Sequence, residues 1–391
     1  MRKTTFMVIG LAIATAVGAA AQIVPPTPPR PVADAVEITV CRRGCAAASI
    51  QEAVDRASPG SIVRIVDPIH TECGVTVDKD LFISGAGSSG TIIQASESLD
   101  SSTDRLFWVN DGATVVFEDL TLQYGRPTDC PKGGGAILNY GMLWLERCVL
   151  RRNRGQCAGA LLNDGFTTAI DCMFLDNHAA GGTTQIGMPA RGSGGAIKNT
   201  RGEMSLWNCT IAGNQAKLRG GAIKNCCEAS LDMFQCTVSG NRSSVAAIHV
   251  RGSVRIAHCT IALNHSNSYG SGLYVAGIAE ISNTIVALNE WGDVIVTDDG
   301  AGSTFASLWV GDGRAASSYS GDPLLGPLAD NGGPTWTHAL LPGSGAIDAA
   351  SPGVDVPAAD QRGAPRARGE APDLGAFEFD ATTSDDREHS D

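Results

Sequence analysis

Aromatic and charged residues are scarce in this chain of 391 residues. Phe, Trp and Tyr make up 5% of it, and Asp, Glu, Lys and Arg make up 18%. Because 43% of the residues are apolar and so few are charged, a largely disordered chain is excluded. Cysteine is also infrequent, with 12 residues, which is too few for a small disulfide-stapled scaffold. The net charge of −12 argues against nucleic acid as the main partner.

Long apolar runs are missing too, except at the N-terminus. Two cationic residues precede an apolar stretch over residues 6–17, and three alanines end at residue 21. This order predicts a signal peptide over residues 1–21, because a membrane anchor would need a longer run. We therefore expect a secreted protein, extracellular or periplasmic, with no membrane-spanning segment in the mature chain. Residues 22–35 are rich in proline and are predicted to form an extended linker.

Glycine and a repeated motif are what the chain has in excess. It contains 47 glycines, well above the usual share of about 7%. A unit of roughly 24 residues recurs between residues 134 and 289, a period that suggests a repeat protein. An insertion over residues 179–193 lengthens one unit; it is either a binding loop or a simple excursion. The units close on Asn153, Asn177, Asn214, Asn241, Asn264 and Asn289.

The repeat predicts an all-β fold. Each unit has glycine at its ends and short alternating aliphatic runs, which disfavours helical hairpins, and the leucine spacing of leucine-rich repeats is absent. We predict a right-handed parallel β-helix of about nine or ten turns over residues 36–290. Ser49 and Glu52 fit a capping box and predict a helical N-terminal cap over residues 49–57. An irregular C-terminal module is expected over 291–379, followed by a disordered tail over 380–391.

Stacked columns follow from this fold, because equivalent residues of adjacent turns lie about 4.8 Å apart. One predicted column at a bend is made of asparagines whose amides hydrogen-bond to one another: Asn139, Asn163, Asn199 and Asn225. Another is made of cysteines, which are either free buried thiols or pairs at disulfide distance: Cys148, Cys172, Cys209, Cys236 and Cys259.

A third column supplies the candidate ligand-binding residues. Lys198, Lys224, His249 and Tyr274 each follow an inward aliphatic residue by one position and should therefore point outward. Three interpretations remain open. The column is a solvated row that blocks aggregation, it binds an anionic glycan, or one lysine acts as a base whose pKa is lowered by its neighbour. No residue is confidently assigned as catalytic.

The remaining cysteines suggest disulfides. Cys130 and Cys157 precede repeat starts in neighbouring turns and could form one, and Cys41 or Cys45 could pair with Cys73. Zinc is not expected, because no second cysteine pair complements the first.

Acidic residues near the end of the repeat region give no clear metal site. Asp293, Asp298 and Asp299 offer oxygen ligands but lack a defined loop motif, so exposed turn acids are the simpler interpretation. We predict no cofactor and no metal, with Ca²⁺ required only if the protein is a lyase.

Three segments resemble known families. SIQEAVDRASPGSIVRIVD resembles the opening of pectate-lyase-like right-handed parallel β-helix proteins. GGAIKN and NCTIAGN resemble the repeats of polymorphic-outer-membrane-protein-like bacterial surface proteins. DNGGPTWTHALLPGSGAIDAA, with DQRGAPR and DLGAFEF, is similar to the C-terminal module of choice-of-anchor Q proteins. The resemblance implies a bacterial secreted or surface β-helix protein over residues 49–379.

Within that C-terminal module, charged residues have a predicted structural role. We interpret Asp360, Arg362, Arg366, Asp373 and Glu378 as an ion-pair network that holds the cap, with a glycan site as the alternative.

The functional expectation follows from the columns. We predict a secreted or cell-surface protein, non-enzymatic, that binds glycans or partners along one solenoid face. The alternative is a polysaccharide lyase or glycoside hydrolase acting on an acidic polysaccharide. A lyase needs acidic Ca²⁺ ligands and a base, and a hydrolase needs converging carboxylates. The sequence shows no column of acids beside the lysines.

Overall fold

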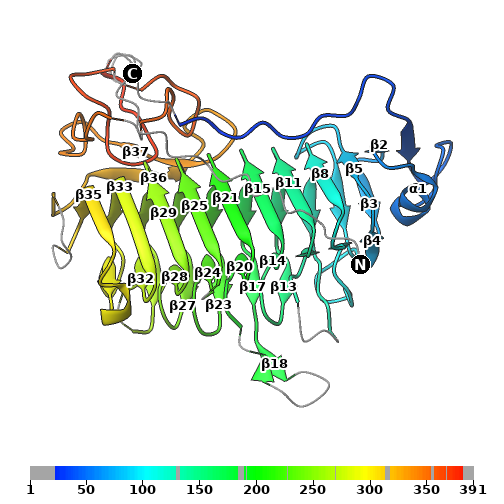
Figure 1. Ribbon diagram of the computed structural model, residues 1–391, viewed down its shortest axis with the longest axis horizontal. Coiled ribbons are helices and arrows are strands. Elements are labelled where there is room, and N and C mark those ends of the chain that lie inside the picture. Colours follow the sequence, from blue (N-terminus) through cyan, green and yellow to red (C-terminus); the bar gives the residue numbers. More distant parts are fainter. Residues whose placement is uncertain are drawn as a thin grey trace, which may run out of the picture.

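The computed structural model is a right-handed parallel β-solenoid of about 10 turns (Figure 1). It describes residues 23–381, apart from 129–132, 184–188, 191, 227, 269, 313–317, 354–355 and 367. The predicted fold class is confirmed. The predicted signal peptide and all but the first two residues of the predicted tail lie outside the described residues.

Each regular turn contributes strands to three sheets. The nine-stranded sheet contains β4 (Val75–Val77), β7 (Phe107–Val109), β10 (Ile137–Asn139), β14 (Leu161–Asn163), β20 (Ile197–Asn199), β24 (Ile223–Asn225), β28 (Ile248–Val250), β32 (Leu273–Val275) and β34 (Val294–Val296). The five-stranded sheet contains β13 (Arg154–Gly155), β17 (His178–Ala179), β23 (Gln215–Ala216), β27 (Arg242–Ser243) and β31 (His265–Ser266).

The nineteen-stranded sheet is bent, because most turns place two strands in it. It contains β1 (Glu37–Val40), β2 (Ser61–Ile65), β3 (Ile69–Thr71), β5 (Leu81–Ser84), β6 (Ile92–Gln94), β8 (Thr114–Glu118), β9 (Thr121–Gln123), β11 (Met142–Glu146), β12 (Val149–Arg151), β15 (Phe166–Ile170), β16 (Met173–Leu175), β21 (Glu203–Trp207), β22 (Thr210–Ala212), β25 (Ser230–Phe234), β26 (Thr237–Ser239), β29 (Ser253–Ala257), β30 (Thr260–Ala262), β33 (Ile278–Ala287) and β35 (Thr304–Val310). The bend falls at one left-handed residue per turn, such as Asn208 (φ 53°) and Gln235 (φ 52°).

Two asparagine ladders run through the interior. In the predicted one, the Nδ2 of Asn163 donates to the Oδ1 of Asn199 at 2.9 Å, and Asn139 and Asn225 continue the chain at 2.8 and 3.0 Å. The closing asparagines of the repeat form the second ladder, which ends where Asn289 donates to the carboxylate of Asp293 at 2.8 Å. Both ladders satisfy buried backbone groups at bends.

The N-terminal cap contains the predicted helix, α1 (Ile50–Arg56). The Ser49 hydroxyl accepts a hydrogen bond from the Glu52 backbone N–H at 3.1 Å. The Glu52 carboxylate accepts from the N–H of Ala48, one residue earlier than in an ideal capping box. Glu72 also accepts from the backbone N–H groups of Ile50 and Gln51, so a later turn of the solenoid fixes the start of the helix.

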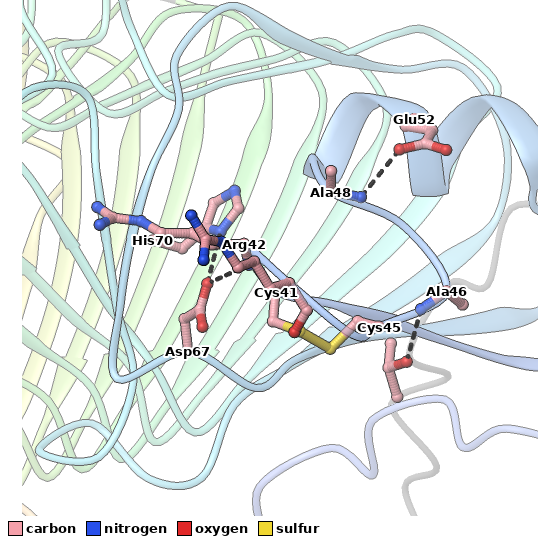
Figure 2. Close-up of a disulfide and its surroundings, with 10 residues drawn as sticks. Cys41, Arg42, Cys45, Ala46, Ala48, Glu52, Asp67 and His70 are labelled. Atoms are coloured by element: carbon pink, nitrogen blue, oxygen red, sulfur yellow. Dashed lines mark hydrogen bonds and ion pairs between the residues drawn. A yellow bond between two sulfur atoms is a disulfide. The ribbon is translucent and has the colours of Figure 1, made fainter.

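The cysteines near the cap pair differently from our expectation. Cys41 bonds to Cys45, and Cys73 is an exposed free thiol, so the suggested pairing with Cys73 is wrong (Figure 2). The Arg42 N–H donates to the Asp67 carboxylate at 2.8 Å, which ties the small disulfide loop to the next turn. The five ladder cysteines are free, buried thiols. The suggested Cys130–Cys157 disulfide stays untested, because Cys130 lies outside the described residues.

The solenoid continues beyond its predicted end at residue 290. Strand β34 pairs with β32, and β35 pairs with β33, so a further turn follows. The repeat motif did not predict this turn, because the turn keeps the apolar alternation but lacks the cysteine and the closing asparagine. Helix η1 (Asp298–Gly300) lies between the two strands.

The C-terminal module lies on the outside of the last turns (Figure 1). Its hairpin, β36 (Leu325–Ala329) with β37 (Thr337–Leu340), is antiparallel. Gln361 links the module to the solenoid, because its amide bonds the hydroxyls of both Thr210 and Thr237 at 3.0 and 2.7 Å. His338 bonds Ser239 at 2.8 Å.

The N-terminal segment before β1 lies along the solenoid rather than hanging free (Figure 1). Arg30 forms ion pairs with Glu118 and Glu146, and Ile23 packs against a cluster that includes Trp207 and Phe234. The proline-rich stretch is extended, and its contacts through Arg30 and Ile23 hold it against the solenoid. No helix among the described residues is long and apolar enough to span a bilayer.

Candidate functional site

The predicted column of Lys198, Lys224, His249 and Tyr274 exists as a register. These residues are the central positions of β20, β24, β28 and β32, and each pairs with the next across one turn. Their side chains alternate with the inward aliphatic residues, because neighbours on a strand point to opposite faces.

The middle of this column is buried, which corrects the expectation that all four residues point into solvent. Lys224 is 6% exposed and His249 3%, whereas Lys198 and Tyr274 are half-buried. The Nζ of Lys224 lies 2.8 Å from the Nδ1 of His249, and the imidazole stacks on Tyr274 with 4.8 Å between ring centroids. Strand alternation correctly predicted that these four side chains point away from the core, but it carries no information on which other residues cover them.

Burial and the charge of Lys224 lower the pKa of His249 to about 3. The imidazole is therefore neutral at pH 7 and can accept a hydrogen bond from the Lys224 ammonium group. The charge of Arg219 acts in the same direction, which places the turn before β24 close to this pair. Only Lys198 and Tyr274 of the four candidates are accessible to a ligand.

A cationic column that the sequence analysis missed lies on the five-stranded sheet. Arg154, His178, Gln215, Arg242 and His265 pair in register from β13 to β31. Arg126 begins the same column, because the Arg154 N–H bonds the carbonyl of Gly125 as later members bond the turn before them. Strands of two residues have no detectable periodicity, although the residue after each closing asparagine was a usable signal, because it is Arg154, His178, Arg242 or His265 in four of the six repeats.

Further cations lie in the turns that follow these short strands. Lys217 and Arg219 are exposed, as is Arg242, while Arg126 and Arg154 are half-buried. We define the cationic flank by its members Arg126, Arg154, His178, Lys217, Arg219 and Arg242. Burial and the charge of Arg154 lower the pKa of His178, so the permanent charge comes from the other five residues.

The cationic flank carries little opposing charge. Asp and Glu are absent from its described segments, which are residues 125–128, 154–158, 178–183, 215–220 and 242–246. Along the chain, Asp129 directly follows Thr128 but lies outside the described residues, and Asp176 precedes His178 by two residues. Asp100 and Asp104 accept hydrogen bonds from Arg126 through their backbone carbonyls, and Glu290 bonds His265 at 3.2 Å at the end of the column. In a protein with a net charge of −12, this is a local excess of positive charge.

A mixed charge column lies on the nineteen-stranded sheet. Asp232, Arg255 and Glu280 are paired across β25, β29 and β33. Desolvation raises the pKa of Asp232, and the carboxylates of Glu203 and Glu280 raise it further, whereas Arg255 opposes them. These acids come from separate strands, so no local sequence motif could predict that they share a column.

The charged residues of the C-terminal module form a buried network. Arg362 pairs with Asp360 at 2.7 Å and lies over the Phe377 ring at 3.6 Å. Asp373 accepts from the backbone N–H groups of Asp348 and Phe379, and burial raises its pKa to about 6. The contacts of Arg362 with Phe377 and of Asp373 with Asp348 each join two segments of the module.

The two remaining predicted residues of that set, Arg366 and Glu378, pair with each other at 3.3 Å. A groove of about 1010 Å³ lies beside the network, between the β36–β37 hairpin and Phe379. Two arginines lie in its wall. Arg362 bonds Asp360 and the carbonyl of Glu378, and Arg368 pairs with Asp380, so their donors are largely used within the module.

Metal ligands do not converge in the described part of the chain: no group of three His, Cys, Asp or Glu side chains is placed to hold an ion. The suggested ligand Asp293 instead exchanges hydrogen bonds with the backbone and carboxylate of Asp312. The predictions about cofactors and Ca²⁺ stay predictions.

Comparison with known proteins gives a likeness of fold. No family model matches the chain, and no curated protein matches it. Among solved structures, the crystal structure of pectate lyase Pel9A is similar, with a TM-score of 0.47 and 14% sequence identity. The match covers 85% of this chain and 91% of that chain. The resemblances to choice-of-anchor Q and polymorphic-outer-membrane-protein-like families stay predictions.

Proposed function

We propose that this is a secreted protein that binds an acidic glycan along the cationic flank, without cleaving it. The observation that carries the proposal is the register stack of Arg126, Arg154 and Arg242 with few acids around it. In the column, Arg126 and Arg154 lie one turn apart, and His178 and Gln215 separate Arg154 from Arg242. Each turn advances by one strand spacing of about 4.8 Å, so a polymer with repeated anions can contact several of these arginines at once.

The chemistry of the flank favours a polymer over a small ligand. Its cations spread over several turns, and most are exposed, so each single contact with an anion is weak in water. Many such contacts along one chain add up, and they attract a polyanion at long range. Lys198 and Tyr274 on the adjacent nine-stranded sheet would extend the surface with a cation and a ring.

The test is electrophoresis of the mature protein in native gels that contain polygalacturonate, dextran sulfate or neutral dextran. We expect retardation by the two acidic polymers, weakening as NaCl rises from 50 to 300 mM. The double variant Arg154→Ala/Arg242→Ala should bind at least tenfold more weakly. The matched control Arg64→Ala/Arg201→Ala removes two cations outside the flank and should bind like wild type. Unretarded wild-type protein in every acidic gel would refute the proposal.

A polysaccharide lyase or hydrolase is the second candidate, favoured by one observation. Asp232 and Glu280 lie in one column with Arg255 between them, and desolvation raises the pKa of Asp232; glycoside hydrolysis uses two carboxyl groups that face one substrate. New reducing ends in polygalacturonate would support a hydrolase, and absorbance from unsaturated uronates, with Ca²⁺ present, would support a lyase. Asp232→Asn should then abolish the hydrolase activity. If no polymer yields a product, glycan binding remains as the proposed function.

A further inference from the structure

The cationic flank contains a small depression at one end. Its volume is about 190 Å³, and its walls come from three successive turns: Arg126–Thr128, Arg154–Gln156 and Ala180–Gly181. It lies where the chain leaves the five-stranded sheet to form the hairpin of β18 (Gly182–Thr183) and β19 (Pro189–Ala190), which projects from the solenoid in Figure 1. One wall is therefore an interruption of the regular turn.

Glycine keeps that wall free of side chains. Gly181 and Gly182 have φ angles of 65° and 146°, which L side chains rarely adopt, so the chain can turn away at once. The returning chain passes close by, because a Cβ on Gly192 would lie 2.3 Å from the carbonyl oxygen of Ala179. The third wall thus presents mainly backbone, and the space in front of the two arginines stays open.

Two guanidinium groups line the depression. Arg126 donates one hydrogen bond, to the carbonyl of Asp100 at 3.2 Å, and within the described residues Arg154 pairs with no carboxylate. The charge of Arg154 lowers the pKa of His178. Two arginines one turn apart with unused donors form a site for a planar or tetrahedral anion, since each can present a fork of N–H groups.

The third polar group of the depression is an acceptor. The Nε2 of Gln156 donates to the carbonyl of Thr128 at 3.3 Å, which points its Oε1 the other way. This Oε1 is buried and has no hydrogen-bond partner among the described residues. A buried acceptor without a partner destabilises the protein, because it has lost its hydrogen bond to water. Because this Oε1 is buried, the Gln156 amide must turn toward the depression before a ligand hydroxyl group can donate to it. A bare inorganic anion has no hydroxyl group to donate.

We propose that this depression is an anchoring subsite for one acidic sugar residue, a uronate, of the glycan. The carboxylate lies between Arg126 and Arg154, and a ring hydroxyl donates to the Oε1 of Gln156. This inference rests on the proposed function and deepens it, because it names the sugar class and the residues that select it. The rest of the flank, with Lys217 and Arg242, holds the chain through weaker, exposed contacts.

The test compares single variants in the same native gels and by calorimetric titration with a short oligogalacturonate. Arg126→Ala and Arg154→Ala should each weaken binding about tenfold to a hundredfold, because each removes a charge-assisted contact. Arg154→Lys should recover only part of the affinity, since it keeps the charge but loses the fork. The matched control is Arg242→Ala, three turns along the same column, which should cost about twofold.

Gln156→Leu separates a sugar from a simple anion. It should weaken the uronate oligomer severalfold and leave inorganic sulfate, used as a second probe at the same ionic strength, unchanged. Equal losses for Arg126, Arg154 and Arg242 variants would overturn the subsite while leaving flank binding in place. Absence of wild-type binding to any acidic polymer would instead remove the proposed function itself. Circular dichroism and thermal midpoints of all variants exclude misfolding as the cause.

Discussion

The guanidinium group of Arg366 lies 3.3 Å from the carboxylate of Glu378, and each side chain is 1% exposed. Arg366 also donates to the backbone carbonyls of Asp373 and Gly375, at 3.3 and 2.8 Å. The pair therefore joins the two segments that close the C-terminal module. A pair so buried holds its neighbours in place, because a charge left alone there would have no solvent to stabilise it.

Removing one member of this pair should loosen the module. We expect Glu378→Gln to lower the free energy of unfolding by about 3–5 kcal/mol, because the Arg366 charge stays buried without its partner. The measurement is urea unfolding followed by tryptophan fluorescence. Arg368→Met serves as the control, since its pair with Asp380 is partly exposed and should be worth less than about 1 kcal/mol. Equal effects of both variants would contradict the assigned role.

The closing-asparagine ladder makes a second stability prediction. The Oδ1 of Asn214 accepts from the backbone N–H and the side chain of Asn177, and its Nδ2 donates to Asn241 and two carbonyls. Asn214→Ala leaves several of these buried groups without partners, so we expect a loss of at least about 3 kcal/mol. Asn267→Ala, at an exposed position, should change the stability by less than about 0.5 kcal/mol. Thermal unfolding of both variants measures these losses, and equal midpoints for the two would contradict the prediction.

These ladders also show how much the sequence could predict. The strand columns, Asn199 and Asn225 among them, recur at the same place in each repeat motif, and such recurrence identifies stacked positions even where an insertion changes the spacing. Lys224 and His249 could not be recognised as buried, because alternation assigns a face but the cover comes from a turn elsewhere in the repeat. Arg126 and Arg154 could not be recognised as neighbours, because the strand of Arg154, β13, is only two residues long and Arg126 lies outside any strand.

The buried imidazole of His249 predicts a pH dependence. Its pKa in the folded protein is about 3, below the ordinary value of about 6.5, so between these values the unfolded chain binds more protons. Stability is therefore full above pH 6.5 and is lost as the pH falls toward 3, by up to about 5 kcal/mol. His249→Gln keeps an acceptor for Lys224 without titrating there. Its unfolding free energy should fall less than that of wild type between pH 7 and 4.5, and parallel curves would refute the prediction.

Asp373 predicts the opposite slope. Its pKa is raised to about 6, so the folded protein binds the proton more tightly than the unfolded chain. Its contribution is full below about pH 4 and is lost as the pH rises through 6, by about 3 kcal/mol at most. Asp373→Asn removes this loss but also weakens an acceptor for a backbone N–H. The quantity to compare is therefore the slope of the unfolding free energy against pH, not its absolute value. Between pH 4.5 and 7 the variant should lose less stability than wild type. A variant curve that falls as steeply as that of wild type would show that Asp373 does not titrate there.

The thiols predict an order of chemical reactivity. Cys73 is exposed, whereas the five ladder cysteines are buried within the solenoid. Burial and the charges of Asp104 and Glu72 raise the pKa of Cys73, so its alkylation should be slow at pH 7 and accelerate toward pH 9. The ladder thiols, such as Cys209, should react only at the rate at which the solenoid unfolds. Mass spectrometry of peptides after timed iodoacetamide treatment measures both rates. Cys73→Ser should remove the fast product without changing the thermal midpoint, and early labelling of Cys209 would show that the solenoid opens locally.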